Sequence, residues 1–411
     1  MTDQHGVVII GGGYGGGETA IKLRQGGYTG PITLISAETH PPYHRPPLSK
    51  AYLAGELAEE ALLIRPQTAY DKANITLRLN TRVTAIDRAG QQITIEGGEK
   101  LPYAELVLAT GGEARALACP GSNLRNVFTL RHRGDAAAIR PLLREGQKLV
   151  VIGGGYIGLE VAAVAAKHGL SVTVLEAAPR LLARVAGPEL GGFFARVHHE
   201  AGVKIFTDAM VCALEPSAAD PDQVGQVVLE DGLRFAADFV LAGIGLVPST
   251  GLAQAAGLKV DNGIMVDEHC CTEDAHIYAI GDVANHFCPP LGQRVRLESV
   301  PNALEQARVC AAWILGSPAP YSAMPWFWSD QYDLKLQSVG ISQGYDRAVI
   351  RGDFNARNVA FFYLRAGKLI AADVINRAAE FMVAKKLVSE KICADPAKLA
   401  DETQPLKALL T

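Results

Sequence analysis

Several patterns that mark common classes of protein are missing from this sequence. Its seven cysteines form no C-x-x-C pair, and its ten histidines include no H-E-x-x-H or comparable spacing, so we expect no metal site. The adjacent Cys270 and Cys271 would make a poor disulfide or metal clamp. We expect every cysteine to be a small hydrophobic residue in a reducing compartment.

Long apolar runs and strong charge imbalance are also missing. The 411 residues carry a formal net charge of -4, without an acidic or basic tail, which argues against nucleic acid or an anionic membrane as the main partner. No apolar stretch approaches the ~18–20 residues needed to cross a bilayer. Residues 1–6 contain no basic segment typical of a secretion signal, so we expect a cytoplasmic protein. The length predicts two or three domains of about 150 residues each.

A short β-branched run at residues 7–10 ends at a glycine-rich turn. Gly11, Gly13 and Gly16 give the pattern G-x-G-x-x-G, followed by a helix and a second strand at 32–35. Runs that are apolar on both faces are typical of parallel strands buried in a sheet. The segment is therefore predicted to form a strand–helix–strand unit.

The same unit occurs a second time. A strand at 149–152 leads into Gly153, Gly155 and Gly158, then a helix and a strand at 172–175. In such units the first glycine permits a tight turn, the second lets backbone approach a pyrophosphate, and the third allows helix and strand to pack closely. The alternative is that the glycines serve packing only. The repeat predicts an α/β fold with two dinucleotide sites.

Acidic residues after the second strand of each unit indicate which nucleotide is bound. Glu176 directly follows its strand and can accept both hydroxyls of an adenosine ribose. No arginine stands immediately beside it, which favours NADH, although Arg180 and Arg184 keep NADPH open. In the first unit the equivalent residue is Ser36, and the nearest acid, Glu38, is our candidate ribose ligand.

Several longer sequence words resemble one enzyme family throughout the chain. The chain is similar to the FAD-dependent NADH:ferredoxin reductases of bacterial oxygenase systems. The words are RPPLSKAYL at 45–53, LATGG at 108–112, VIGGGYIGLEV at 151–161, AGIG at 242–245, AIGD at 279–282, ESVPNALEQA at 298–307 and PWFWSDQ at 325–331.

This resemblance implies a domain layout. It places two Rossmann-like dinucleotide-binding domains, arranged as in glutathione reductase, before a smaller α+β C-terminal domain. The expected divisions are an FAD-binding domain at 1–112 and 246–322, an NAD-binding domain at 113–245, and a C-terminal interface domain at 323–411. Within the last, we expect hairpin strands near 346–375 and then a helix over about 377–391.

The resemblance also implies three catalytic residues. Lys50 would lie near flavin N5 and pair with Glu160, and Trp328 would lie near the isoalloxazine ring. A carboxylate and an ammonium in a desolvated place would keep each other ionised. The alternatives are a solvated Lys50, a surface acid at Glu160, and Trp326 and Trp328 as a buried core pair.

Further residues are implied as cofactor ligands. Asp282 would accept from ribityl hydroxyls, the alternative being an ordinary helix N-cap, and a helix from Asn302 to about Trp313 would direct its dipole at the pyrimidine end of the flavin. Asp135 is a weaker candidate near the pyrophosphate. The implied FAD ligands are Gly11, Gly13, Tyr14, Gly15, Gly16, Glu38, Arg45, Lys50, Val83, Thr110, Gly111, Arg131, Gly281, Asp282, Val300 and Trp328. The implied NAD ligands are Gly153, Gly155, Tyr156, Ile157, Gly158, Glu160, Glu176, Arg184, Gly243, Ile244 and Gly245.

The implied activity is NADH-dependent reduction of a [2Fe–2S] ferredoxin that serves a haem-thiolate monooxygenase or a ring-hydroxylating dioxygenase. Disulfide reductases of this broad fold carry a dithiol after the first glycine motif, but no cysteine precedes Cys119 here. Related single-cysteine enzymes use the region held here by Tyr43 and His44. Both absences indicate that electrons leave directly from the flavin.

Docking of the ferredoxin is implied at Arg65, Arg308 and Trp326, because ferredoxins are acidic and basic groups would steer them. The alternative is that both arginines are ordinary solvated side chains. Two other functions stay open. One is a reductase for rubredoxin or a small acceptor, and the other is a flavoprotein similar to apoptosis-inducing factor.

Overall fold

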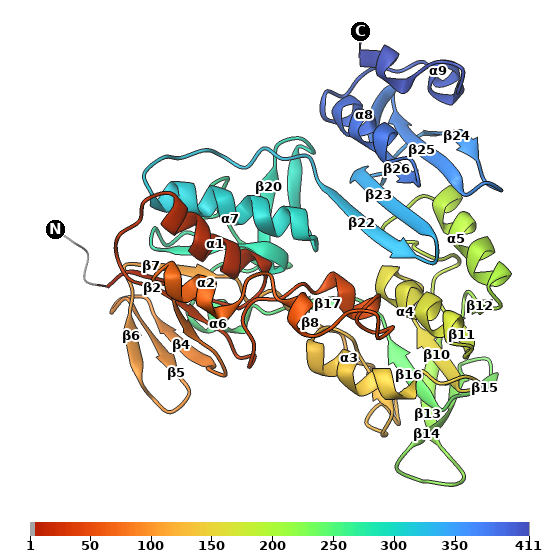
Figure 1. The fold of residues 1–411 in the computed structure, drawn as a ribbon, viewed down its shortest axis with the longest axis horizontal. Coiled ribbons are helices and arrows are strands. Elements are labelled where there is room, and N and C mark those ends of the chain that lie inside the picture. The colour runs from red at the N-terminus through yellow and green to blue at the C-terminus, as the bar shows by residue number, and fades with distance from the viewer. Residues whose placement is uncertain (1–4, 411) are drawn as a thin grey trace. The chain divides into compact units, whose positions relative to one another are not determined.

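The computed structural model describes residues 5–410 (Figure 1). The expectation about a secretion signal rests mainly on Met1–Gln4, which lie outside the described residues. Across residues 5–410, no helix combines the length and apolar character that crossing a membrane requires.

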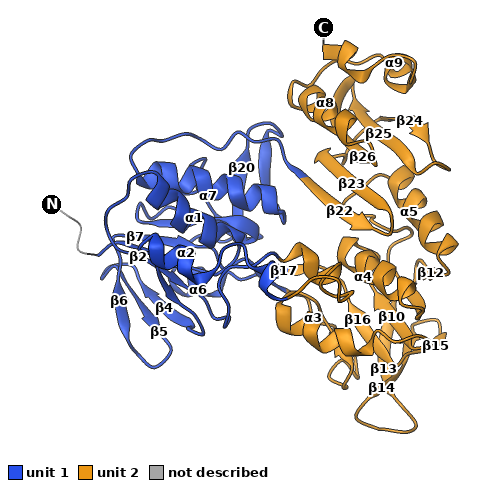
Figure 2. Cartoon of the chain, viewed as in Figure 1, with its two compact units in different colours: residues 1–44, 59–113, 247–326 blue, residues 45–58, 114–246, 327–411 orange. Residues whose placement is uncertain are grey.

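The chain divides into two compact units, coloured separately in Figure 2. Unit 1 comprises residues 1–44, 59–113 and 247–326, and unit 2 comprises residues 45–58, 114–246 and 327–411. The short segment 45–58 therefore groups with unit 2, although the residues on either side of it belong to unit 1. The division into three domains at the boundaries given above stays a prediction.

Unit 1 is built around a five-stranded parallel sheet. The first glycine-rich unit supplies its centre, where Val7 pairs with Ile32 on one side and with Glu105 on the other. Helices α1 (Tyr14–Gln25) and α7 (Val300–Ile314) pack against each other beside this sheet. The strand order is β19 (Ile277–Ala279), β7 (Glu105–Leu108), β1 (Val7–Ile10), β2 (Ile32–Ile35) and β3 (Thr76–Arg78).

Unit 2 contains a second parallel sheet of the same design. Val150 pairs with Thr173 and with Val240, and helix α4 (Tyr156–Lys167) covers the central strands. The strand order is β12 (Lys204–Phe206), β11 (Ser171–Leu175), β10 (Lys148–Ile152), β16 (Phe239–Ala242) and β9 (Val127–Phe128). Both predicted strand–helix–strand units, and with them the α/β class, are confirmed.

The C-terminal part of unit 2 is a five-stranded sheet with a helix packed on it. Strands β23, β26, β25 and β24 pair antiparallel, as the predicted hairpins require. Helix α8 (Ala378–Ser389) contacts β23 and β26 and matches the predicted helix closely. The strand order is β22 (Trp326–Gln331), β23 (Leu334–Gly340), β26 (Lys368–Ile375), β25 (Asn358–Arg365) and β24 (Arg347–Asp353).

The remaining elements are small sheets and short helices. The strands are β4 (Val83–Asp87), β5 (Gln92–Ile95), β6 (Lys100–Pro102), β8 (Gly112–Ala114), β13 (Val211–Pro216), β14 (Val224–Leu229), β15 (Arg234–Ala236), β17 (Leu246–Pro248), β18 (Ile264–Met265), β20 (Ala284–Cys288) and β21 (Gln293–Arg296). The helices are α2 (Gln67–Lys72), α3 (Arg133–Ile139), α5 (Pro188–Glu200), α6 (Gly251–Ala255), α9 (Pro396–Ala400) and the 3₁₀ turns η1 (Pro46–Ser49), η2 (Glu60–Leu62), η3 (Arg140–Leu142), η4 (Gly281–Val283) and η5 (Leu406–Leu410).

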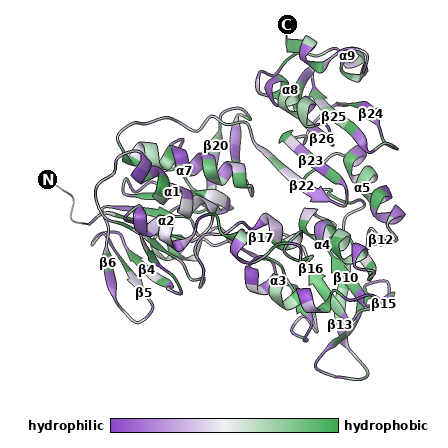
Figure 3. Cartoon of the chain, in the orientation of Figure 1, coloured by the Kyte–Doolittle hydropathy of each residue, from purple (hydrophilic) through white to green (hydrophobic). Residues whose placement is uncertain are grey.

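Central strands of both parallel sheets are made almost entirely of apolar residues, and Figure 3 shows β10 and β16 in green for this reason. All four residues of β1 and of β16 are buried. Helices on the two faces of a parallel sheet remove both sets of side chains from water, so an unbroken hydrophobic run is required. The cores therefore hold the glycine-rich turns at fixed positions on the carboxyl ends of these strands.

Candidate functional site

The first glycine-rich turn can exist only with glycine at two of its positions. A Cβ atom on Gly11, which has a φ of 120°, would lie 2.1 Å from the Ala109 carbonyl oxygen. One on Gly16 would lie 2.0 Å from the Gly11 carbonyl oxygen. Around Gly13, by contrast, nothing lies within 4 Å of the Cβ position. The close contacts fix the turn, and the open position leaves room for a ligand above it.

The second glycine-rich turn repeats this arrangement. Gly153 has a φ of 103°, and its Cβ would lie 2.5 Å from the Gly243 carbonyl oxygen. A Cβ on Gly158 would lie 2.2 Å from the Gly153 carbonyl oxygen, whereas one on Gly155 would meet nothing closer than 3.9 Å. No side chain caps α1 or α4 at its N-terminus. Both turns therefore fit a pyrophosphate, because uncapped N–H groups and the helix dipole favour an anion there.

The ribose candidates differ between the two turns. Glu176 accepts hydrogen bonds from the backbone N–H of Gly154 at 2.6 Å and of Ala178 at 2.8 Å, so its carboxylate is fixed beside the second turn. Glu38 accepts from the Tyr43 hydroxyl at 2.5 Å, and its own N–H donates to the Ser36 hydroxyl at 3.2 Å. Glu176 therefore lies beside its predicted turn, whereas the Glu38 side chain bonds Tyr43; binding of ribose by either acid stays a prediction.

The two arginines that kept NADPH open behave differently from each other. Arg180 donates to the backbone carbonyls of Leu181 at 3.4 Å and Ala183 at 3.0 Å, so its guanidinium belongs to its own loop. Arg184 is exposed, and its guanidinium would lie 3.3 Å from a Cβ on Gly245. Arg184 thus lies beside the predicted dinucleotide segment of residues 243–245.

Lys50 and Glu160 form the ion pair that the resemblance implied. Lys50 Nζ lies 2.7 Å from Glu160 Oε2, and the glutamate side chain is only 3% exposed. Two hydroxyls complete the carboxylate's contacts, because Ser49 donates to Oε2 at 2.5 Å and Ser329 donates to Oε1 at 2.6 Å. Burying a carboxylate is tolerated when it is paired with a cation and hydrogen-bonded, and Glu160 meets both conditions. The catalytic roles of Lys50 and Glu160 stay predictions.

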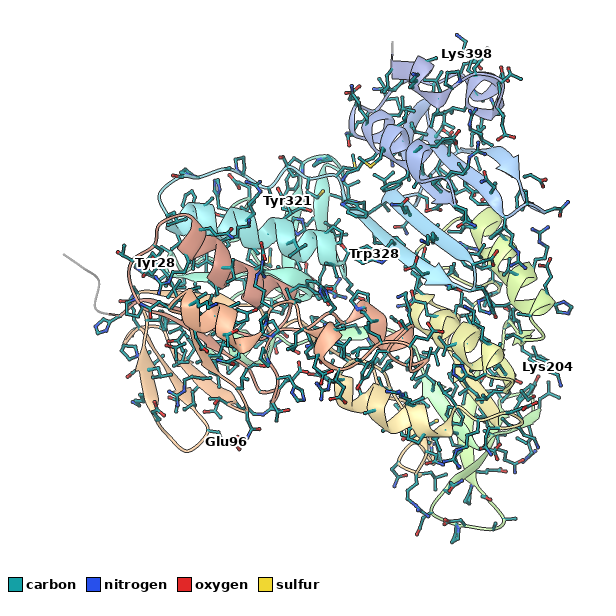
Figure 4. The ribbon with its side chains drawn as sticks, in the orientation of Figure 1. Tyr28, Glu96, Lys204, Tyr321, Trp328 and Lys398 are labelled. Carbon is teal, nitrogen blue, oxygen red and sulfur yellow. The ribbon has the colours of Figure 1, made fainter. Side chains whose placement is uncertain are left out.

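Strand β22 contacts helices α4 and α5 through alternate residues. Phe327 packs edge-on against Tyr156 with ring centroids 4.8 Å apart, Ser329 donates to Glu160, and Gln331 accepts from His198 at 2.8 Å. Trp328 and Asp330 take the other face, where an open pocket is lined by them and by residues 335–337 and 376–378. Figure 4 labels Trp328 on this strand.

Unit 1 holds most of the remaining predicted FAD ligands. The Thr110 hydroxyl donates to the Ser249 carbonyl at 2.9 Å, and Tyr14 bonds His44 at 2.6 Å. Gly111 and Gly281 have φ of 62° and 75°, so each turn needs a left-handed conformation that glycine adopts without strain. The others are Gly15 in α1, Val83 at the start of β4, Asp282 in η4 and Val300 at the start of α7.

In unit 2, Arg45 and Arg131 are in contact. Arg45 donates to the Arg131 carbonyl at 2.9 Å. Asp135 accepts from the backbone N–H groups of Arg131 and His132, both at 2.8 Å, and thereby caps α3. Asp135 therefore has a structural role, whichever ligand lies nearby. Ile157 is 44% exposed on α4, beside the predicted NAD ligand Tyr156.

The arginines predicted to dock a ferredoxin are both ion-paired. Arg65 donates to Glu18 at 3.0 Å, and Arg308 donates twice to Glu305, at 3.1 and 2.6 Å. A partner must therefore compete with a carboxylate of unit 1 for each of them. Trp326 begins β22 and is half-buried.

The sequence did not single out Ser49, Ser329 or Gln306 as site residues. Ser49 and Ser329 both lie within words quoted for the resemblance, but only the folded chain shows that each donates to Glu160. Gln306 is likewise inside such a word, and it is fully buried. The sequence did contain one indication of its role, because Gln306 is a polar residue on the apolar face of the helix predicted from Asn302.

Comparison with known proteins identifies the family. The model of the family described as pyridine nucleotide-disulphide oxidoreductase matches residues 5–307, and that of the reductase C-terminal domain matches residues 326–410. The chain belongs to the pyridine nucleotide-disulphide oxidoreductase family. It is therefore an oxidoreductase, with the extra C-terminal domain that the second match describes.

Among members of this family, putidaredoxin reductase from Pseudomonas putida is 46% identical over 100% of this chain and 98% of its own. A rubredoxin-NAD(+) reductase from the same organism is 41% identical over 90% of this chain and 95% of its own. The solved covalent putidaredoxin reductase–putidaredoxin complex matches with a TM-score of 0.96 at 46% identity, covering 99% of this chain and 98% of that one.

Proposed function

We propose that this protein is an NADH-dependent ferredoxin reductase that takes hydride from NADH through FAD and delivers single electrons to a [2Fe–2S] ferredoxin. The ferredoxin would serve a haem-thiolate monooxygenase or a ring-hydroxylating dioxygenase. The observation that carries this proposal is the ion pair between Lys50, which follows η1, and the buried Glu160 of α4, the helix that follows the second glycine-rich turn.

The two glycine-rich turns have separate tasks in this proposal. FAD, which this family binds, would occupy the turn of Gly11, Gly13 and Gly16, and NADH would occupy the turn of Gly153, Gly155 and Gly158. Bound FAD would supply an acceptor of two electrons that can release them singly. Accordingly, we assign residues 1–112 and 246–322 to FAD, 113–245 to NAD and 323–411 to the C-terminal interface domain.

The chain's own residues would orient and discriminate the nucleotide. Glu176, fixed by two backbone N–H groups, has lone pairs left to accept ribose hydroxyls and would repel a 2′-phosphate. Glu160 would hold the Lys50 ammonium in one place within a water-poor environment. Asp282 and Thr110 would add polar contacts to the flavin.

The cysteines argue against the thiol chemistry of other family members. All seven are free, and five of them follow residue 269 while none precedes Cys119. Burial raises the pKa of the Cys271 thiol to about 12 and also raises the pKa of the Cys270 and Cys310 thiols, so these three stay protonated and unreactive. Free thiols fit the cytoplasm, which we propose as the compartment.

The test is NADH-driven cytochrome c reduction by the purified holoenzyme, with and without a [2Fe–2S] ferredoxin. We expect the ferredoxin to accelerate the reaction strongly and NADPH to support it poorly. Ferricyanide reduction, which needs no protein partner, serves as the control. If no ferredoxin accelerates cytochrome c reduction while ferricyanide is reduced, the electron-carrier proposal fails.

The same assay should be run with rubredoxin as the electron acceptor. A relative named rubredoxin-NAD(+) reductase matches 90% of this chain, so rubredoxin is the alternative partner. Faster cytochrome c reduction with rubredoxin than with any [2Fe–2S] ferredoxin would favour this alternative.

A further inference from the structure

Unit 1 buries a connected set of polar side chains that the proposed chemistry does not use. His286 is 1% exposed, Asn302 is 3% exposed and Gln306 is 0% exposed. Burying polar groups costs free energy unless they are hydrogen-bonded. Gln306 is hydrogen-bonded to both Asn302 and His286 and to the backbone N–H of Gly281, so these side chains are held in one arrangement.

The Gln306 carboxamide joins both ends of one short segment. Its Oε1 atom accepts from the backbone N–H of Gly281 at 2.7 Å, and its Nε2 donates to His286 Nδ1 at 3.0 Å. Residues 281–286 contain η4 and the start of β20, with Asp282 between the two anchor points. One side chain on α7 therefore holds the whole turn that presents Asp282.

Asn302, one helical turn earlier on α7, extends the network. Its Nδ2 donates to the Leu297 carbonyl at 3.2 Å and to Gln306 Oε1 at 3.4 Å. Its Oδ1 accepts from the Tyr321 hydroxyl at 3.1 Å, and Tyr321 is labelled beside α7 in Figure 4. The N-terminus of α7 and the Gly281 turn are thus positioned through one set of amides.

His286 is an acceptor in this network because it stays neutral. Burial, with a smaller effect of Arg294, lowers its pKa to about 4. Since Gln306 donates to Nδ1, the proton lies on Nε2, which has no hydrogen-bond partner within residues 5–410. An apolar side chain would avoid the cost of that unpaired N–H. The Nδ1 acceptor is therefore the feature that the imidazole supplies.

We propose that Gln306 and His286 are positioning residues that hold Gly281 and Asp282 in the geometry needed to bind FAD. This inference rests on the proposed function, because it takes the FAD site as given. Gln306 does not touch the cofactor in this proposal. It acts through its hydrogen bond from the Gly281 N–H and through the spacing of residues 281–286.

Three variants of the holoenzyme test the inference. Gln306→Met removes both amide functions at similar volume, His286→Leu removes the Nδ1 acceptor, and His286→Asn keeps an acceptor close to the Nδ1 position. The readouts are FAD release, followed by the fluorescence of free flavin, and the midpoint potential of the bound flavin. Gln331→Met is the matched control, because Gln331 is equally buried and bonds His198 in unit 2.

We expect Gln306→Met and His286→Leu to weaken FAD retention at least tenfold and to shift the midpoint potential. His286→Asn should match the unmodified protein in both readouts, and Gln331→Met should retain FAD. Equal retention and potential in Gln306→Met and the unmodified protein would overturn the positioning role. If Gln306→Met does not fold, the His286 variants decide, and equal release from His286→Leu and His286→Asn overturns it. Purified protein that binds no FAD at all would instead defeat the proposed function.

Discussion

Ser329 donates a hydrogen bond of 2.6 Å to Glu160, although the two residues are 169 positions apart in the chain. The serine belongs to strand β22 of the C-terminal sheet, the glutamate belongs to helix α4, and both are buried. The other carboxylate oxygen of Glu160 receives Ser49 and Lys50. Glu160 on α4 therefore contacts two other chain segments, residues 49–50 and strand β22, which are far from it in sequence.

Neutralising this carboxylate should slow the enzyme. In Glu160→Gln the amide cannot hold the Lys50 cation, and charge-assisted hydrogen bonds are worth about 1.5–3 kcal/mol. We expect NADH-driven ferricyanide reduction to fall roughly 10- to 100-fold, measured at saturating NADH. Glu215→Gln is the control, because Glu215 pairs with the exposed Arg234 at 3.4 Å and should matter little. Equal rates in both variants would contradict the role given to Glu160.

Removing the carboxylate of Glu176 should change nucleotide binding more than turnover. Glu176→Ala loses the ribose acceptor and leaves the N–H groups of Gly154 and Ala178 without their carboxylate. We expect the KM for NADH to rise about 10- to 100-fold, because hydrogen bonds to a charged group contribute about 1.5–3 kcal/mol. The change in kcat should be smaller. Steady-state kinetics with NADH and NADPH measure both effects. An unchanged ratio of NADH to NADPH efficiency would be the contrary result.

Reversing one exposed charge should affect the protein partner only. Arg308→Glu places two carboxylates beside each other with Glu305, and it would repel an acidic ferredoxin. We expect the apparent KM for the ferredoxin to rise and to lose part of its salt dependence, while ferricyanide reduction stays unchanged. Arg125→Glu is the matched control, because Arg125 is an exposed residue of unit 2 that pairs with Asp220. Identical ferredoxin kinetics in both variants would remove Arg308 from the docking surface.

Two buried histidines should make the fold sensitive to acid. Burial lowers the pKa of His198 and His286 to about 4 from an ordinary 6.5. Both are neutral above pH 6.5 in either state, but between pH 6.5 and 4 only the unfolded chain takes up these protons. Each histidine should therefore remove about 3 kcal/mol of stability over that range.

A buried acid opposes the histidines. Burial raises the pKa of Asp373 to about 6 from an ordinary 3.8, so below pH 6 the folded chain takes up this proton first and gains stability. Two histidines outweigh one aspartate, and urea unfolding should show a net loss between pH 6.5 and 4. Asp373→Asn should steepen the loss and His286→Asn should reduce it. A profile that is flat across this range would contradict the assigned protonation states.

The two strand–helix–strand units could be predicted because they depend on local sequence patterns. Features that depend on contacts between residues far apart in sequence could not be predicted from the residues themselves. Gly11 and Gly153 could be placed because each turn depends on residues adjacent in sequence. The helix expected from Asn302 begins at Val300, because Ser299 accepts from the Asn302 N–H and Pro301 suits a first turn. The Lys50–Glu160 pair came from the resemblance alone.

Contacts made by hydroxyl and amide groups could not be predicted from spacing. Ser329 and Ser49 find Glu160 only after three segments have packed, and Gln306 meets His286 only across a helix–strand contact. The segment 45–58 lies within the range that the predicted layout assigns to FAD, and in the folded chain it groups with unit 2. Its contacts explain this, since Lys50 pairs with Glu160 and Arg45 donates to Arg131.

The alternation along β22 has a consequence for how this enzyme can be recombined with its relatives. Phe327, Ser329 and Gln331 contact Tyr156, Glu160 and His198, while Trp328 faces the other way. Because side chains alternate at every residue, one residue inserted between Trp326 and Trp328 would bring the Trp328 indole opposite the carboxylate, and one residue deleted there would bring Asp330. Chimeras should therefore tolerate junctions of variable length before Trp326. From Trp326 to Gln331 they should keep the number of residues unchanged.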